Sequence, residues 1–283
     1  MSRREKLLHE LPFGVDYAKS ARARCKYCEM NIPKGELRLS VRYPSHKFMK
    51  MQDNWLHERC FWKSVRKDEL SEATIYGFEA LEWEDQQMLR EKIIFNEKEI
   101  KKDEELNDAD VKDIPLVSSG KDLEALKEQT KMLSEIKKEL TEFKLNLKEL
   151  EEIINANDYY VRADEGVFEL TERLADLIVF GVPSKCQKCK EGTLFYDYTE
   201  HAYKCEGTDE KACGLSDPNP KRKPLKVPEN WVENGFLENR KLPMLKARSY
   251  PPGAHVKMDT VTDYPRDRIR RPTRFGKHLE DKD

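Results

Sequence analysis

The stretches Cys25-Lys26-Tyr27-Cys28 and His57-Glu58-Arg59-Cys60 decide how the first part of this chain folds. In each stretch two metal-binding side chains flank two other residues, a spacing that lets a tight turn or the first turn of a helix bring both onto one ion. Either pair alone would be ambiguous, because Cys-x-x-Cys also occurs in redox enzymes and single histidines are common. Three thiolates and one imidazole fill a tetrahedral zinc shell and leave no open position for a substrate. The two pairs together therefore predict one structural zinc site.

The remaining cysteines form a second complete set of ligands: Cys186, Cys189, Cys205 and Cys213. The total of seven cysteines is odd, and an odd number argues against a disulfide framework. Residues 193–198 and 201–204 have the pattern of two strands and predict a zinc ribbon. His201 lies near these ligands in the sequence, but four cysteines already saturate a metal. We therefore expect two zinc ions per chain and a reducing compartment.

The composition favours small cores separated by solvated segments. Of the 283 residues, 38% are hydrophobic and 37% are charged, which is unlike a large enzyme with a single core. The densest apolar patch, Leu177-Ile178-Val179-Phe180, is too short to span a membrane, and the N-terminus does not lead into the apolar run of a signal peptide. No nucleophile stands out beside a general base. The sequence thus predicts a soluble intracellular binding protein rather than an enzyme.

Cations dominate the region of the first zinc site, residues 16–67, where many lysines and arginines face few acids. Within it, residues 43–51 alternate apolar and cationic side chains and should form a loop between strands near 37–41 and 54–57. Phosphates attract such cations, and exposed base faces stack on aromatic rings. The alternative is an ordinary solvated surface, with Phe48 and Met51 packed beneath the loop. An anionic partner is the interpretation that the aromatic residues favour.

The predicted fold class is α+β, with three helices in the second half of the chain. Apolar residues recur at helical spacing over 123–143, 147–154 and 170–180, and Gly181 ends the last helix. A coiled coil would also suit the first stripe, but breaks at Asn146 and Asn157 favour a compact helical subdomain. The predicted parts are a zinc-stabilised finger at 11–95 closed by a helix at 84–95, a flexible acidic linker at 96–120, a helical subdomain with a zinc ribbon at 121–252, and a disordered basic tail at 253–283.

Several short words surround the first ligand set: Val15-Asp16-Tyr17-Ala18-Lys19-Ser20, Ile32-Pro33-Lys34, Trp55-Leu56-His57, Cys60-Phe61-Trp62-Lys63 and Gly77-Phe78-Glu79-Ala80-Leu81-Glu82-Trp83-Glu84-Asp85-Gln86-Gln87. With the ligand spacing they resemble the first zinc finger of DNA-break-sensing poly(ADP-ribose) polymerases over about residues 11–95. The same finger type is also found in a DNA ligase and in a DNA-end-processing phosphatase, so it implies a reader of broken DNA without specifying the host protein. Residues 121–252 resemble the third zinc domain of the same polymerases.

The resemblance implies roles for individual residues of the finger. Arg22 and Arg38 match positions that grip the sugar-phosphate backbone, and Lys19 is a weaker candidate of the same kind. Phe48 matches the aromatic residue that stacks on a base exposed at a break. The second stacking position falls at Met51 or Gln52. Trp83 matches a residue used for contact between domains, and its alternative role is core packing of the closing helix.

The resemblance therefore implies a zinc-dependent nuclear protein that binds DNA strand breaks, in the DNA damage response or in the regulation of a poly(ADP-ribose) polymerase. The catalytic ADP-ribosyltransferase domain of that family has no counterpart in these 283 residues, so no NAD turnover is expected. Candidate partners are broken DNA, such a polymerase and other nuclear proteins, with no membrane. The alternatives are a fragment or relative of an NAD ADP-ribosyltransferase, and a scaffold that binds proteins through its helical stripe and ribbon.

Two basic clusters are left outside this interpretation. They are Lys221-Arg222-Lys223-Pro224 and Arg266-Asp267-Arg268-Ile269-Arg270-Arg271. Either cluster could bind an import receptor or nucleic acid.

Overall fold

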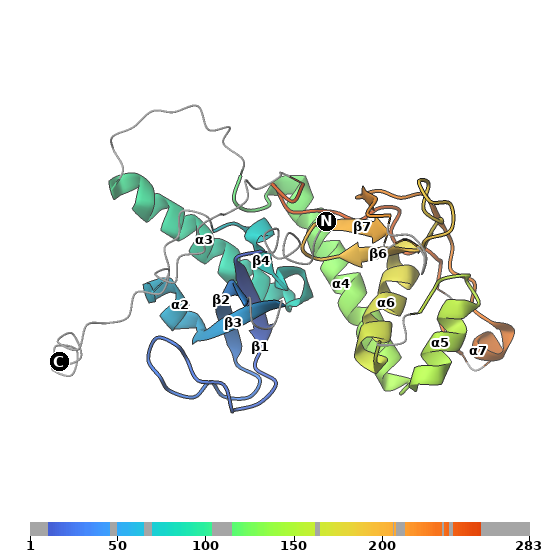
Figure 1. The fold of residues 1–283 in the computed structure, drawn as a ribbon, viewed down its shortest axis with the longest axis horizontal. Coiled ribbons are helices and arrows are strands. Elements are labelled where there is room, and N and C mark those ends of the chain that lie inside the picture. Colours follow the sequence, from blue (N-terminus) through green and yellow to red (C-terminus); the bar gives the residue numbers. More distant parts are fainter. Residues whose placement is uncertain are drawn as a thin grey trace. The chain divides into compact units, whose positions relative to one another are not determined.

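The computed structural model describes residues 11–45, 50–64, 70–103, 115–161, 165–205, 207, 213–233, 235–237 and 240–255. The chain divides into two compact units (Figure 1). The first comprises the chain up to Ser118 with the residues from Pro251 onward, and the second spans Ser119–Tyr250. Both units mix helices with small sheets, which confirms the predicted α+β class. Among the described residues, no helix combines the length and the apolar character needed to cross a membrane.

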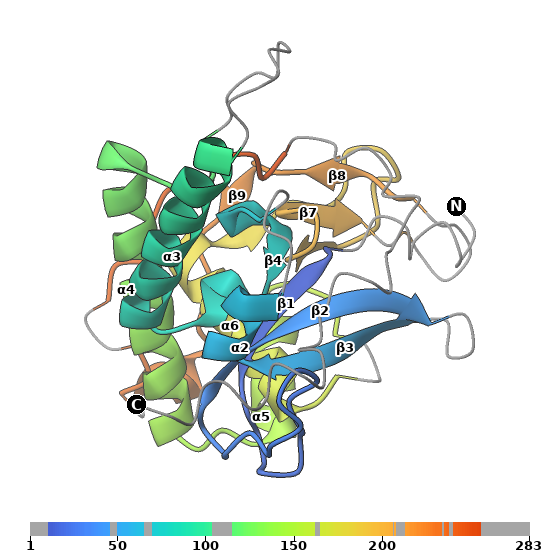
Figure 2. The same ribbon diagram turned by 90° about the vertical axis from the view of Figure 1, so that its left-hand side faces the viewer.

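The first unit is built on a four-stranded sheet with the order β3-β2-β1-β4. Its strands are β1 (Phe13–Tyr17), β2 (Leu37–Ser45), β3 (Lys50–His57) and β4 (Ile75–Tyr76). The strands β1, β2 and β3 are antiparallel neighbours and lie side by side in Figure 2. Because β2 and β3 are longer than predicted, most of the expected loop at 43–51 is paired strand. Only its tip, residues 46–49, falls between the strands, outside the described part of the chain.

One face of this sheet forms the core of the first unit. Leu39 and Leu56 are fully buried on it, as the two-residue period of a strand requires. Helix α2 (Glu58–Ser64) covers this face, and its Phe61 ring meets Phe13 edge-on with centroids 5.7 Å apart. Helix α3 (Trp83–Asp103) adds buried residues to the same core, and the short 3-10 helices η1 (Glu72–Thr74) and η2 (Phe78–Ala80) precede it. The opposite face of the sheet carries polar and charged side chains.

The predicted linker at 96–120 is shorter in the structure than the sequence suggested. Helix α3 continues to Asp103 instead of ending at residue 95, because residues 96–103 contain good helix formers and neither Gly nor Pro. At the other end, the carbonyl of Leu116 accepts a hydrogen bond from the Glu72 backbone N–H (2.9 Å), and the Ser118 N–H donates to the Glu72 carboxylate (3.0 Å). The start of the predicted linker is therefore part of α3, its end is hydrogen-bonded to Glu72, and residues 104–114 lie outside the described part.

Three helices form the main core of the second unit. They are α4 (Gly120–Glu142), α5 (Leu147–Asn155) and α6 (Val167–Phe180), close to the predicted ranges. Asn146 caps α5, since its side chain accepts from the Glu149 N–H (3.2 Å) while the Glu149 carboxylate accepts from the Asn146 N–H (2.7 Å). The stripes pack on one another as a compact subdomain, not as the alternative coiled coil. Two predicted stripe residues are exceptions. Phe143 follows the end of α4, is 38% exposed and contacts the Phe236 ring, and Leu147, the first residue of α5, is 37% exposed.

The zinc ribbon is a three-stranded sheet with the order β6-β7-β8. Its strands are β6 (Leu194–Asp197), β7 (Ala202–Cys205) and β8 (Ser216–Asp217). A second, two-stranded sheet pairs β5 (Val182–Pro183) with β9 (Arg222–Lys223), and the short helix α7 (Glu229–Glu233) follows. A buried polar cluster joins the ribbon to α6: the Tyr203 hydroxyl donates to Asp176 (2.9 Å), and Arg248 pairs with the same carboxylate.

Candidate zinc centres and nucleic-acid interface

Three different elements position the ligands of the first zinc centre. Cys25 and Cys28 lie in a turn of the loop between β1 and β2, where the Glu29 N–H donates to the Cys25 carbonyl (2.9 Å) and Glu29 adopts a positive φ of 63°. His57 is the last residue of β3, and Cys60 lies in α2, which begins at the next residue after His57. The zinc centre therefore ties the β1–β2 loop to the end of the β2–β3 hairpin.

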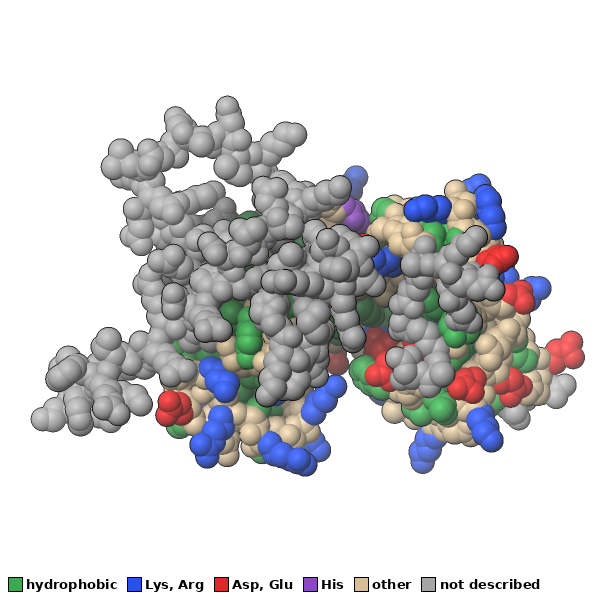
Figure 3. Space-filling model, in the orientation of Figure 1, with side chains coloured by type: hydrophobic (Ala, Val, Ile, Leu, Met, Phe, Trp, Pro, Cys, Tyr) green, Lys and Arg blue, Asp and Glu red, His purple; other side chains and the backbone are tan. Residues whose placement is uncertain are grey.

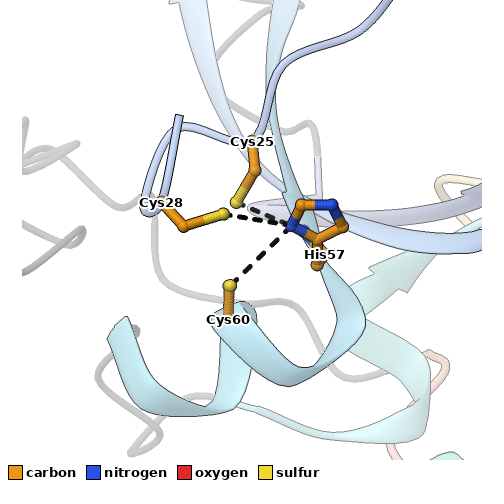
Figure 4. A group of neighbouring side chains, drawn as sticks. All are labelled: Cys25, Cys28, His57 and Cys60. Atoms are coloured by element: carbon orange, nitrogen blue, oxygen red, sulfur yellow. Dashed lines mark hydrogen bonds between the residues drawn. The ribbon is translucent and has the colours of Figure 1, made fainter. Parts of the chain in front are cut away.

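The donor atoms of the four residues converge on one point (Figure 4). They all lie within 4.8 Å of one another, with Nδ1 of His57 3.3 Å from Sγ of Cys28 and 3.8 Å from Sγ of Cys60. The other ring nitrogen, Nε2, lies 3.0 Å from the carbonyl of Asn31. As a donor to that carbonyl, Nε2 keeps the proton, so Nδ1 is the unprotonated nitrogen that a metal requires.

The thiols of this centre differ in acidity. Burial opposes ionisation of Cys25, but hydrogen bonds from the backbone N–H groups of Cys28, His57 and Tyr27 lower its pKa to about 7. Burial raises the pKa of Cys60 to about 12, and the neighbouring charge of Cys25 adds to the increase. Several thiolates at such short separations repel one another unless a cation lies between them. The donor set thus fits a bound zinc ion, which needs deprotonated thiols.

The second zinc centre belongs to the ribbon. Sγ of Cys186 lies 3.6 Å from that of Cys213, and Sγ of Cys189 lies 3.6 Å from that of Cys205, with all four within 4.8 Å. Backbone N–H groups of Lys188, Gly192 and Gly207 donate to three of these sulfurs. His201 is buried in the turn before β7 and is not part of this group of four. The set of four cysteines is the one predicted from the sequence.

Gly192 is a requirement of the second centre that the sequence pattern did not reveal. A Cβ at this position would lie 2.4 Å from Sγ of Cys205 and 2.9 Å from Sγ of Cys189. A bound zinc ion would hold both sulfurs in place, so they could not move aside for a side chain. The backbone N–H of Gly192 also donates to Sγ of Cys189 (3.3 Å), and the absence of a side chain lets this backbone lie close to both sulfurs.

The two donor sets fit zinc and confirm the prediction of two zinc ions per chain. One offers three sulfurs with one imidazole nitrogen, and the other offers four sulfurs. Each set fills a tetrahedral shell, so the bound metal would cross-link strands and loops and would not activate a substrate.

The polar face of the first sheet carries two arginines that lie flat on aromatic rings. The guanidinium of Arg38 lies 3.9 Å from the Trp55 ring centre, and that of Arg42 lies 4.4 Å from the Tyr76 ring centre. Each arginine also pairs with an acid, since Arg38 Nη2 is 3.4 Å from Asp16 and Arg42 Nε is 3.4 Å from Asp53. Stacking on a ring fixes the orientation of a guanidinium and leaves its edges for further contacts.

Five of the six residues predicted to bind DNA are described, and they fall into three groups. Lys19 and Arg22 are exposed on the β1–β2 loop. Arg38 is buried on β2, in the stack described above. Met51 and Gln52 are half-buried residues of β3 rather than of a loop, and Gln52 accepts a hydrogen bond from the Tyr43 hydroxyl (2.8 Å). Phe48 lies outside the described residues.

Basic side chains also gather on the surface of the β1–β2 loop. In Figure 3, several Lys and Arg side chains lie on the described surface of the first unit where Figure 1 places this loop. The loop contains Arg24, Lys26 and Lys34, all exposed, besides the two predicted cations. Such a surface favours an anionic partner.

Sequence reasoning missed Ser40, Arg42, Asp53 and Tyr76 as parts of this face. Ser40 donates to Asp53 (2.7 Å), which also pairs with Arg42. The signal available in the sequence was the alternation Arg38-x-Ser40-x-Arg42, because residues two apart on a strand share a face. The partner strand and its register were needed to place Asp53 opposite Arg42.

Trp83 occupies the first turn of α3 and is half-buried. Its ring lies 4.8 Å from the guanidinium of Arg90, which is also 5.1 Å from the Phe78 ring and forms a buried ion pair with Glu72 (2.6 Å). Trp83 therefore contacts a charged side chain of its own helix. Its predicted role in contact between domains remains a prediction.

Comparison with known proteins finds a family match in each of the two units. Residues 16–93 match the family model described as "Poly(ADP-ribose) polymerase and DNA-Ligase Zn-finger region", and residues 120–181 match "PADR1, N-terminal helical domain". The chain is 31% identical over 259 residues to Poly [ADP-ribose] polymerase 1 of Gallus gallus, covering 86% of this chain and 24% of that protein. It is 30% identical over 246 residues to the Danio rerio protein of the same name, covering 84% of this chain and 23% of the relative. The Caenorhabditis elegans protein is 44% identical over 85 residues, 29% of this chain and 9% of the relative.

The first of these matches identifies residues 16–93 as a zinc finger of the poly(ADP-ribose) polymerase type. The similarity to the Gallus gallus and Danio rerio polymerases extends well beyond the finger, since it covers most of this chain. The chain spans about a quarter of the length of those relatives.

Proposed function

We propose that the first unit binds DNA at strand breaks and that it does so in the nucleus. The observation that carries this proposal is the link between the zinc centre and the β2–β3 hairpin. His57 ends β3, so a bound metal would fix the base of the β2–β3 hairpin, and Phe48 lies in the sequence between these two strands. A rigid hairpin can hold an aromatic residue against a base face, and an unbroken duplex exposes no such face except at its ends.

The cations beside the hairpin would supply the second part of the binding energy. Arg22 and Lys19 are exposed on the β1–β2 loop, and Arg38 lies on β2 with its guanidinium fixed on Trp55. Phosphate contacts of this kind depend on salt and not on the integrity of the duplex. In this proposal the cations bind any DNA, and Phe48, assisted by Met51 or Gln52, selects the break.

The test is a titration of the 283-residue chain against closed circular, nicked and linear duplex DNA at two salt concentrations. Base stacking contributes roughly 1–3 kcal/mol, so Phe48→Ala should weaken binding to nicked and linear DNA about ten- to a hundredfold. Binding to closed DNA should barely change. Met30→Ala, which removes an exposed apolar side chain of the same finger, is the matched control and should bind like wild type.

Arg22→Glu should weaken binding to all three forms of DNA and flatten the salt dependence. Lys34→Glu makes a similar change of charge on the same loop and should have a smaller effect, since Lys34 is not assigned a phosphate contact. If wild type does not prefer broken DNA, or if Phe48→Ala weakens all forms equally, the proposal of break recognition is wrong.

We further propose that these 283 residues act by binding and do not themselves turn over NAD. Both zinc centres are closed to substrates, and the matched part of the relatives is about a quarter of their length. A role in the DNA damage response, or in regulating a poly(ADP-ribose) polymerase, would follow from binding of the same breaks. Sustained release of nicotinamide by the pure chain with nicked DNA would refute this part of the proposal.

A further inference from the structure

The basic cluster Lys221-Arg222-Lys223-Pro224 is part of a folded element. Its central residues form β9, which pairs with β5 through Pro183↔Arg222 and Val182↔Lys223. The guanidinium of Arg222 lies 4.2 Å from the Tyr203 ring centre, and its Nη1 donates to the carbonyl of Gly181 (3.5 Å). An import receptor would require an extended and accessible basic segment, so this anchored strand suits a different ligand.

A cleft of about 240 Å³ opens beside this strand in the second unit. Its walls combine cations with rigid apolar groups, namely Arg222, Lys223, Lys246, Phe180 and three prolines. Backbone contacts hold both sides of the cleft. The Leu245 N–H donates to the carbonyl of Val179 (2.8 Å) next to Lys246, and a Cβ on Gly181 would lie only 2.8 Å from the carbonyl of Lys223.

The positive charge of this cleft is largely uncompensated. None of the described residues that line it is Asp or Glu. Among described residues, neither Arg222 nor Lys246 forms an ion pair, and Lys223 has only a distant and exposed partner, Asp158, at 3.7 Å. Three cations around one small cleft attract an anion, and all three can interact with its charge at short range.

We propose that this cleft is a binding site for a phosphate monoester. A monoester carries nearly two negative charges at neutral pH, which matches Arg222 together with Lys246 and Lys223. The phosphate would contact the three cations, and the prolines would contact the group that carries it. A duplex backbone is a poorer fit, because each of its phosphates carries one charge and a wide double helix cannot enter so small a cleft.

The experiment is a titration of the zinc-loaded 283-residue chain with inorganic phosphate, followed through its backbone amide NMR signals. We expect saturable shifts for amides of residues 180–182, 222–223 and 245–246. Dimethyl phosphate, a singly charged diester, should bind more weakly. Adenosine monophosphate and a phosphoserine peptide form two further arms that distinguish a nucleotide from a phosphorylated side chain as the source of the monoester.

Lys246→Gln is the decisive variant, because Lys246 is exposed and its loss should not disturb folding. Removing one charge-assisted contact should weaken phosphate binding roughly tenfold. Lys221→Gln is the matched control: it removes a cation from the same cluster that does not line the cleft, and it should bind within about twofold of wild type.

The proposal is overturned if phosphate produces no saturable shifts, if dimethyl phosphate binds as well as phosphate, or if both glutamine variants bind alike. The last result would show a diffuse attraction of anions to surface charge. None of these measurements contains DNA, so their outcome is independent of the test of break recognition.

Discussion

At the scale of single residues, the arginines of the finger differ in how much of the fold depends on them. Arg22 is exposed on a loop, whereas the side chain of Arg38 is 11% exposed between Asp16 and the Trp55 ring. A stacked guanidinium contributes to stability as well as to binding, because its ring contact is protected from water. Measurements of stability can therefore distinguish the roles of the two arginines.

We predict that Arg38→Gln lowers both DNA affinity and the stability of the finger, and that Arg22→Gln lowers DNA affinity alone. Loss of the contact with Trp55 should cost about 1 kcal/mol of unfolding free energy. Each substitution should reduce the salt slope of DNA binding by about 1. Thermal unfolding measures the stability of the finger in both variants, and a DNA titration measures their affinities. Equal losses of stability would contradict the predicted difference.

A second prediction at this scale concerns Gly192. Alanine at this position would put a methyl carbon 2.4 Å from Sγ of Cys205, so Gly192→Ala should displace a ligand and lose the ribbon zinc. Metal analysis should then return about one zinc per chain instead of two. Gly166→Ala is the control, because its Cβ would meet only the flexible end of Glu169 at 3.1 Å. A Gly192→Ala protein that retains both ions would refute this role.

At the scale of elements, the ribbon is held to helix α6 by a charge buried among aromatic rings. Arg248 pairs with Asp176 and lies 3.7 Å from the Tyr196 ring centre, and burial raises the pKa of Tyr203, which donates to the same carboxylate, to about 12. Tyr203 therefore remains a neutral donor through the physiological range. A buried carboxylate in such a cluster depends on each of its partners.

Removing the cation from this cluster should be costly. Arg248→Met leaves Asp176 buried without its counter-ion, and we expect a loss of roughly 3–5 kcal/mol of unfolding free energy in the second unit. Asp176→Asn added to Arg248→Met should recover part of this loss, because the neutral amide still accepts from Tyr203. Urea denaturation followed through amide signals of α6 measures both variants. A loss below about 1 kcal/mol for Arg248→Met would show that the cluster is not needed.

Elements were predictable where one local signal dominated. Cysteine spacing and helical stripes located both zinc centres and helices α4 to α6, because each signal lies within a short stretch of chain. The lengths of β2, β3 and α3 were not predictable, since β pairing depends on distant partners and the charged residues 96–103 suit a helix as well as a linker. The stacking of Arg38 and Arg42 on aromatic rings could not be predicted, because it depends on the register of the sheet. The pattern of one strand does not contain that register.

At the scale of the whole molecule, the structure consists of two units, each with its own zinc centre and its own core. Cys60→Ala should therefore unfold the finger and leave the helices of the second unit intact, with about one zinc per chain. Cys213→Ala should have the reciprocal effect. Metal content and the dispersion of amide NMR signals report on both units at once. If either variant unfolds the whole chain, the two units are not independent in stability.

Because Trp55 contacts Arg38, its fluorescence can report on binding to the finger. The emission of an indole responds to a charge above its ring, and Trp55 is one of four tryptophans in the chain. The others lie elsewhere: Trp62 donates to Glu58 (2.5 Å), Trp83 lies beside Arg90, and Trp231 belongs to α7 in the second unit. A phosphate that binds Arg38 would change the electric field at the Trp55 indole. DNA binding can therefore be followed by tryptophan fluorescence without an attached dye. Trp55→Phe should abolish that signal.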